Sequence, residues 1–136
     1  MRRCQEVPPE ELQKAVEEFN SGDWFECHET LEELWVGEKG ELRDFYQGLL
    51  QIAVALHHLR NGNFKGAVNL LKGGSECLSR VSPVCQGVDA ARLVSDAGKL
   101  HEALTAAGEE RMSEPELYLI PKLHPVKPLC AAVEKP

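Results

Sequence analysis

The fold of this chain is decided by one long apolar stretch, ELRDFYQGLLQIAVALHHLR, which runs from Glu41 to Arg60. Its apolar side chains recur every three or four residues, which is the spacing of one face of an α-helix. The main face is made by Phe45, Leu49, Ile52, Leu56 and Leu59. Because further apolar side chains widen this face, the helix is apolar over most of its circumference, as interior helices are. The stretch therefore predicts a central helix over residues 41–60.

Four further helices are predicted on the two sides of this stretch. The first begins after Pro8 and Pro9 and ends in the turn 20–23, and the second runs over residues 24–35. The fourth covers residues 64–80. Its glycine pair, 73–74, weakens it, since each interior glycine costs about 1 kcal/mol relative to alanine. Asp89 can cap a fifth helix that ends near residue 106.

A short internal repeat predicts how these helices are connected. Residues 22–24, Gly-Asp-Trp, recur as Gly-Asn-Phe at 62–64, and a small residue and then a leucine follow at the same spacings in both copies. A glycine turn followed by an aromatic residue is typical of the start of an antiparallel helical hairpin. We therefore expect an all-α fold, with about five helices in antiparallel hairpins, in a single domain over residues 1–128.

The C-terminal end of the sequence differs in kind from the rest. Four prolines between residues 114 and 129 prevent a continuous helix. We expect an extended Pro-rich segment in which Leu117, Leu119 and Ile120 pack over the helices, and a flexible tail over residues 129–136. No stretch alternates apolar and polar residues as a strand does, so we expect no sheet.

The composition narrows the classes of function. The chain has 15 Lys+Arg against 22 Asp+Glu and a formal net charge of −7, which disfavours nonspecific binding to nucleic acid. No apolar run reaches the length of a membrane span or of a signal peptide. The five cysteines are odd in number and include no pair separated by two residues, so a reducing cytosol is the simplest context. We expect a cytoplasmic protein with no membrane partner.

Two sets of polar residues interrupt the apolar helix faces. On the second helix, His28 and Glu32 fall inside the apolar sector and Glu29 falls at its margin. On the third, Gln47, Gln51 and His58 share one side, because they are four and seven residues apart. A buried carboxylate needs a hydrogen-bonding or charged partner. We therefore expect the two sets to meet in a largely dry interior between neighbouring helices.

This cluster has three interpretations. In the first, it is a satisfied polar network that fixes the pairing of the two helices. In the second, His28, Glu32 and His58 bind a divalent metal such as zinc, iron or manganese, and Glu29 is the base of a hydrolase-like enzyme. The pattern His-Glu-Thr-Leu-Glu over residues 28–32 resembles the helical zinc-protease motif with its second histidine replaced by glutamate.

In the third interpretation the cluster borders a binding groove. Trp24, Phe25, Trp35 and Tyr46 lie near the polar set, and an apolar cleft with a few polar groups is typical of a ligand site. Of the three, we favour a noncatalytic binding or scaffold module that needs no cofactor. Its partner would be a protein or a small-molecule ligand, and a homo-oligomer is compatible with the same surface.

Three segments of the sequence together resemble a known family. They are FNSGDWFECHETLEELW at 19–35, FYQGLLQIA at 45–53, and His58 with the Gly-Asn-x-x-Gly-Ala turn at 62–67. In this order and spacing they are similar to the small helical family called domain of unknown function 309. The resemblance implies an all-α fold and no established activity. The positions that match its motif are His28, Glu29, Glu32, Trp35, Gln47, Gln51, His58, Asn63 and Gly66.

Overall fold

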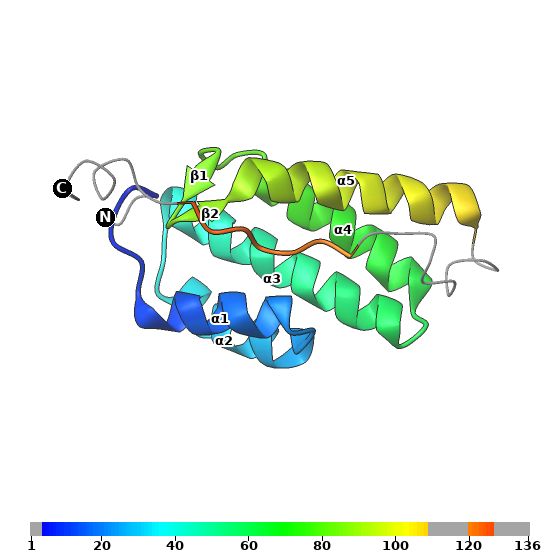
Figure 1. The fold of residues 1–136 in the computed structure, drawn as a ribbon, viewed down its shortest axis with the longest axis horizontal. Helices are drawn as coiled ribbons and strands as arrows, with labels where there is room; N and C mark the ends of the chain where they lie inside the picture. Colours follow the sequence, from blue (N-terminus) through cyan, green and yellow to red (C-terminus); the bar gives the residue numbers. More distant parts are fainter. Residues whose placement is uncertain (1–3, 109–119, 127–136) are drawn as a thin grey trace.

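The computed structural model describes residues 4–108 and 120–126, and helices account for most of them (Figure 1). The chain forms α1 (Glu10–Asn20), α2 (Trp24–Val36), α3 (Gly40–Arg60), α4 (Phe64–Leu78) and α5 (Ala90–Ala107). The predicted all-α class and all five predicted helices are confirmed, with bounds that differ by at most two residues. No described helix is both long and apolar enough to cross a bilayer.

The helices form a layered bundle with α3 at its centre. Successive helices run in opposite directions, and α3 packs against both α2 and α4, while α1 covers α2 and α5 covers α4 (Figure 1). Helices that are neighbours along the chain are therefore also neighbours in space, as short connections between antiparallel helices require. Four side chains of the predicted central face are almost completely buried in α3: Phe45, Leu49, Ile52 and Leu56.

The contact between α3 and α4 depends on two glycines that face each other. A Cβ atom added to Gly48 would lie 2.5 Å from Cγ of Leu78 and 3.0 Å from the carbonyl oxygen of Gly74. A Cβ atom added to Gly74 would lie 2.7 Å from Cγ1 of Ile52 and 2.9 Å from the oxygen of Gly48. The two backbones approach so closely that no side chain fits between them. The pair 73–74, expected only to weaken α4, thus includes a position that the packing requires.

The two copies of the repeat form matching turns at the same end of the bundle. Gly22 and Gly62 have φ values of 82° and 81°, a left-handed conformation that glycine adopts readily. The second turn is closed by Asn63, whose Oδ1 accepts a hydrogen bond from the Gly66 amide at 3.1 Å. Arg60 links the two turns, because its Nη1 donates to the Gly22 oxygen at 2.7 Å. The hairpin geometry predicted from the repeat is therefore present in both copies.

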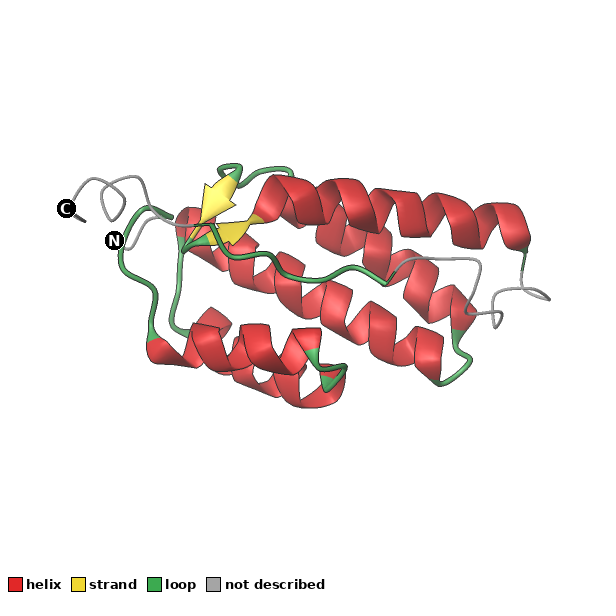
Figure 2. Cartoon of the chain, in the orientation of Figure 1, coloured by secondary structure: helices red, strands yellow, loops and turns green. Residues whose placement is uncertain are grey.

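A small antiparallel sheet corrects the expectation that the chain has none. Strands β1 (Val84–Cys85) and β2 (Val88–Asp89) form a hairpin before α5 (yellow in Figure 2). Strands of two residues are too short to show an alternating pattern, so periodicity cannot predict them. After the hairpin, Asp89 caps α5 as predicted, since its Oδ1 accepts from the Arg92 amide at 3.0 Å.

The described part of the Pro-rich segment, residues 120–126, is extended and crosses the bundle (Figure 1). Leu123 is 2% exposed, and its backbone forms two hydrogen bonds with the Asn20 side chain, of 2.7 and 2.9 Å. Ile120 packs against the core, as predicted. Leu117, Leu119 and the tail over residues 129–136 lie outside the described residues.

The cysteines have different environments, which the sequence analysis did not distinguish. Cys4 and Cys85 form a disulfide, whereas Cys27 and Cys77 are free and buried. Burial, and secondarily the nearby Glu18 carboxylate, raises the pKa of the Cys27 thiol to about 12. Its Sγ donates a hydrogen bond to the Ala15 carbonyl oxygen at 3.3 Å. Cys27 therefore joins α2 to α1 as a neutral thiol, in keeping with the apolar position predicted for it.

The glycine contact between α3 and α4 predicts opposite effects for two similar substitutions. Gly74→Ala should lower the free energy of unfolding by about 1–3 kcal/mol, because the added methyl group forces the helices apart. Gly98→Ala in α5 is the control, since nothing lies within 4 Å of its added Cβ atom. It should raise the free energy of unfolding by about 0.5–1 kcal/mol through helix propensity alone. Chemical denaturation measures both. Equal stabilisation by the two variants would contradict the role given to Gly74.

The Cys27 thiol predicts a specific loss of stability at alkaline pH. In the unfolded chain the thiol deprotonates near its ordinary pKa of 9.0, whereas the folded chain keeps the proton until about pH 12. The contribution of Cys27 is thus complete below pH 9.0 and is lost as the pH rises toward about 12. The free energy of unfolding, measured across this pH range, should fall more steeply for the wild type than for Cys27→Ala. Parallel curves would show that the thiol ionises equally in both states.

Candidate functional site

One side of α2 is left open to solvent, and it carries three of the seven site residues predicted from the sequence. We call it the α2 edge: Phe25, His28, Glu32 and Trp35. The side chain of His28 is 26% exposed and that of Glu32 is 56% exposed. The expectation of a largely dry interior is therefore wrong for Glu32. The helical wheel placed Glu32 correctly in the apolar sector, but α2 packs mainly on α1 and α3, which leave this part of the sector uncovered.

His28 and Glu32 interact with each other on the α2 edge. Nε2 of His28 lies 3.2 Å from Oε2 of Glu32, one helical turn away. The partner that the carboxylate was expected to need is thus on its own helix and not on α3. The other ring nitrogen of His28, Nδ1, is buried and has no hydrogen-bond partner among the described residues.

An exposed aromatic ring lies beside His28 and bridges α2 to α3. The Phe25 ring is centred 5.8 Å from that of His28 and 5.6 Å from that of His57, and the residue is 50% exposed. We call these three residues the Phe25 patch. The sequence predicts Phe25 in a groove but indicates no role for His57, which comes from the end of α3. The missed signal was that residue 57 lies on the side of α3 that faces α2.

Trp35 occupies the other end of the α2 edge and is partly buried. The guanidinium carbon of Arg43 lies 4.2 Å from the centre of the Trp35 ring, within the range of a cation–π contact. Trp35 therefore helps to join the end of α2 to the first turns of α3.

The polar stripe predicted on α3 is present, and all three of its residues are partly exposed. Gln51 points toward α4, where its Oε1 would lie 2.7 Å from a Cβ atom added to Gly73. His58 lies at the end of α3, with its Nδ1 3.4 Å from Nδ2 of Asn63. Among the described residues, no hydrogen bond connects Gln47, Gln51 or His58 to His28 or Glu32. The two polar sets occupy adjoining helices but do not form one network.

The ligand set of the metal interpretation is not assembled. Within residues 4–108 and 120–126, no group of three or more His, Cys, Asp and Glu side chains is arranged to hold a metal ion. His58 therefore does not join His28 and Glu32 in a shared site. Glu29, the expected base, is exposed on α2.

The cysteine beside His28 is also unsuited to nucleophilic chemistry. Cys27 is completely buried, and its raised pKa of about 12 keeps the thiol neutral near neutral pH. The thiolate is the reactive form, so a buried neutral thiol that bonds to Ala15 does not attack a substrate.

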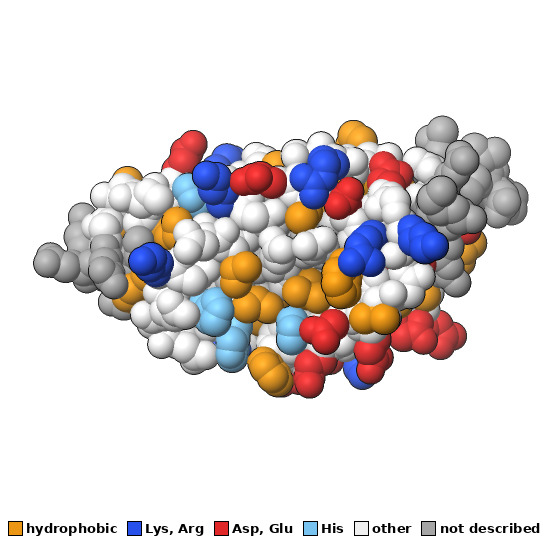
Figure 3. All heavy atoms as spheres, turned by 180° about the vertical axis from the view of Figure 1, so that it is seen from behind, with side chains coloured by type: hydrophobic (Ala, Val, Ile, Leu, Met, Phe, Trp, Pro, Cys, Tyr) orange, Lys and Arg blue, Asp and Glu red, His pale blue; other side chains and the backbone are white. Residues whose placement is uncertain are grey.

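The net negative charge of the protein is concentrated in the first two helices and the turn between them. Residues 10–36 include nine carboxylates and a single cationic residue, Lys14. Since the whole chain has a formal charge of −7, the remaining residues are nearly balanced. Four of these carboxylates are exposed on α2: Glu26, Glu29, Glu32 and Glu33. Figure 3 shows histidine and hydrophobic side chains gathered along one side of the molecule, with acidic side chains close by.

A groove of about 640 Å³ lies elsewhere, between α4 and α5. Leu71 and Ser75 line it from α4, and Gly98 and His101 line it from α5. None of the site residues predicted from the sequence contributes to this groove.

Part of the chain is similar to known proteins. Residues 12–70 match the family described as "Domain of unknown function (DUF309)". An uncharacterized protein of Aquifex aeolicus (strain VF5) is 38% identical over 62 residues, which are 45% of this chain and 19% of that protein. The uncharacterized protein YpuF of Bacillus subtilis (strain 168) is 32% identical over 100 residues, 71% of this chain and 58% of YpuF.

The matched part of the chain spans less than two thirds of either relative. All of the α2 edge, the α3 stripe and both glycine turns fall inside residues 12–70, whereas Cys4 and Cys85 fall outside. The fold also accounts for two motif positions, because a Cβ atom at Gly66 would lie 2.8 Å from the Asn63 side chain. Residues 12–70 of this chain are therefore similar to the DUF309 family, and the two relatives named above are uncharacterised proteins.

Proposed function

We propose that the protein is a noncatalytic binding module that contacts a partner protein through the Phe25 patch. The observation that carries the proposal is the half-exposed Phe25 ring, held between the imidazoles of His28 and His57. Apolar side chains of this size are normally packed inside a domain, and an aromatic ring on the surface is typical of the centre of a protein interface.

The neighbours of Phe25 support this function because they hold the ring in place. His28 is held by Glu32, and Nε2 of His57 lies 3.1 Å from Nδ2 of Asn61. A ring that is already fixed loses little conformational freedom when a partner covers it, which favours affinity. The partner would bury the exposed half of the ring and the two imidazole edges.

The charge around the patch indicates the chemistry of the partner. Glu26, Glu29 and Glu33 are exposed on α2 and have no ion-pair partner among the described residues. A cationic protein surface with an apolar side chain at its centre would complement them, and a nucleic acid would be repelled. The proposal requires no metal or cofactor, and it includes the cytoplasmic location expected from the cysteine pattern of the sequence.

Removal of the phenyl ring tests this function. Phe25→Ala should reduce partner capture about tenfold or more, which is the effect of losing an interface hot spot. Because the ring is half exposed, the variant should stay folded and lose about 1–2 kcal/mol of stability, less than a fully buried phenylalanine. The measurement is affinity capture from a lysate of the source organism, quantified by mass spectrometry of the proteins retained by wild type and variant.

Val84→Ala provides the matched control, because Val84 is also an exposed apolar residue, at 40%, but belongs to β1. It should retain the same proteins as the wild type. If Phe25→Ala also retains them at the same level, the Phe25 patch is not a binding surface and the proposed function is wrong.

A further inference from the structure

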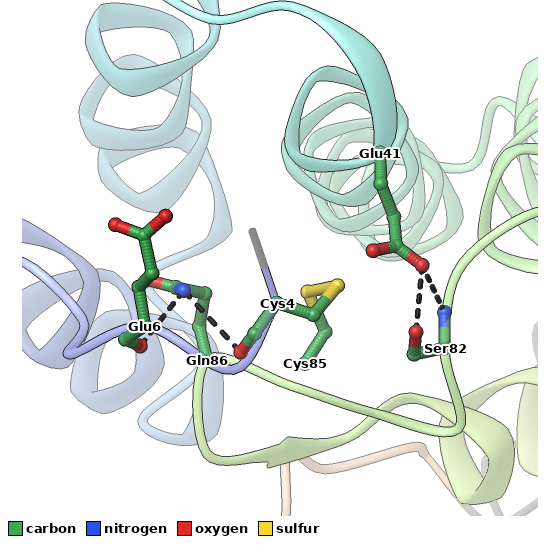
Figure 4. Close-up of a disulfide and its surroundings, with 6 residues drawn as sticks. All are labelled: Cys4, Glu6, Glu41, Ser82, Cys85 and Gln86. Atoms are coloured by element: carbon green, nitrogen blue, oxygen red, sulfur yellow. Dashed lines mark hydrogen bonds between the residues drawn. A yellow bond between two sulfur atoms is a disulfide. The ribbon is translucent and has the colours of Figure 1, made fainter. Parts of the chain in front are cut away.

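The disulfide joins two parts of the chain that are 81 residues apart. Cys4 lies in the segment that precedes α1, and Cys85 lies in β1 (Figure 4). Both residues are buried, at 2% and 0% exposure. Of residues 4–9, Cys4 alone is buried. The disulfide is therefore the main attachment of this N-terminal segment to the rest of the protein.

Gln86, the residue after Cys85, adds the hydrogen bonds that hold the same segment. Its backbone amide donates to the Cys4 carbonyl oxygen at 2.7 Å. Its Nε2 donates to the Glu6 carbonyl oxygen at 3.0 Å (Figure 4). Gln86 has a φ of 52°, a left-handed conformation that is uncommon for a residue with a side chain. The contacts with the N-terminal segment therefore support a turn that the local sequence does not favour.

The other side of the hairpin holds the C-terminal segment. The Val126 amide donates to the Gly87 oxygen at 2.7 Å, and the Asp89 amide donates to the His124 oxygen at 2.9 Å. We call the three connected parts the terminal clasp: residues 4–6, 84–89 and 122–126. The hairpin lies between the two other parts. If the N-terminal segment detaches, the turn residues Gln86 and Gly87 transmit the change to the C-terminal segment.

The loop before the hairpin is attached to the helices by a separate contact. Oε2 of Glu41, in the first turn of α3, accepts hydrogen bonds from the backbone amide and the hydroxyl of Ser82, at 2.8 and 2.7 Å (Figure 4). The helical core thus keeps its own link to the chain before β1 when the disulfide is broken.

We propose that the Cys4–Cys85 disulfide is a reversible redox switch that opens and closes the terminal clasp. This rests on the proposed cytoplasmic location, because disulfides in that compartment are usually transient and redox-sensing. The reductant is a dithiol. Its first thiolate attacks one cysteine sulfur, forms a mixed disulfide and releases the other cysteine as a thiolate. Its second thiol then attacks the mixed disulfide and becomes a ring disulfide with the first. Two electrons and two protons pass to Cys4 and Cys85.

In the reduced protein, the described part of the N-terminal segment loses its covalent attachment and keeps the hydrogen bonds to Gln86. Residues 5–8 are exposed and add no buried apolar surface, so the segment detaches from the hairpin. The Gln86 turn loses its support, and the hydrogen bonds to residues 124 and 126 open with it. The five helices retain their packing, because their core does not depend on the disulfide.

Hydrogen exchange on the full-length chain tests the switch in oxidised and reduced dithiothreitol. The amides of Gln86, Asp89 and Val126 report on the clasp, since each donates one of its hydrogen bonds. On reduction they should exchange about tenfold faster or more, and they should regain protection on reoxidation, while buried amides in α3 remain unchanged. Alkylation followed by mass spectrometry should detect two additional thiols in the reduced chain, mapped to Cys4 and Cys85.

Two serine variants complete the design. Cys4→Ser should show the rapid exchange of the reduced state and should not respond to dithiothreitol. Cys77→Ser is the matched control, because it removes a free buried cysteine and should respond as the wild type does. If Cys4→Ser does not fold, the reduced wild type still provides the measurement.

Three results would overturn the switch. The first is an equal number of reactive thiols with and without dithiothreitol. The second is unchanged exchange of the three clasp amides after reduction. The third is loss of α3 protection together with that of the clasp, which would make the disulfide a permanent structural bond. Because none of these measurements involves the Phe25 patch, their failure would leave the proposed binding function standing.

Discussion

The structure depends on the close approach of α3 and α4 at Gly48 and Gly74. Where two helix backbones touch, the axis spacing is fixed by main-chain atoms, and every other layer must conform to it. Leu78 and Ile52 fill the space immediately beside the two glycines. Through α3 this constraint extends to α2, and through α4 it extends to α5. The position of the α2 edge thus depends on the contact between Gly48 and Gly74, which lies on the opposite side of α3 and contains no candidate site residue.

The helices could be predicted well because their signals are local. The helical spacing of the apolar residues and the positions of the turn residues located all five helices. The turns at Gly22 and Gly62 were visible as a repeat in the sequence. The terminal clasp could not be predicted, because Cys4 and Cys85, and likewise Gly87 and Val126, are far apart in the sequence and are brought together only by the fold. The glycines of α4 were found but misinterpreted, since helix propensity records their cost and cannot reveal that α3 requires a position without a side chain.

For the candidate site, the sequence predicted the direction of the side chains around each helix but not how deeply they are buried. A helical wheel gives the angle of a side chain, and it placed His28 and Glu32 correctly on one edge. It does not state how far the neighbouring helices reach around that edge, so it could not show that Glu32 remains 56% exposed. For the same reason the contact between Phe25 and His57 was missed, because it depends on how α2 crosses α3. The α2 edge and the α3 stripe lie inside the residues that match the DUF309 family, whereas Cys4 and Cys85 of the terminal clasp lie outside them.

The concentration of negative charge on α1 and α2 affects how the protein is oriented as it approaches a charged partner, before the two are in contact. Nine carboxylates beside one lysine, in a molecule whose other residues are nearly neutral, give the protein a permanent electric dipole. Such a molecule rotates in the field of an approaching cation-rich body, so that collisions occur with one orientation more often than chance allows. Added salt would then slow the rate at which complexes form, while their lifetime would depend mainly on the short-range contacts that are made afterwards.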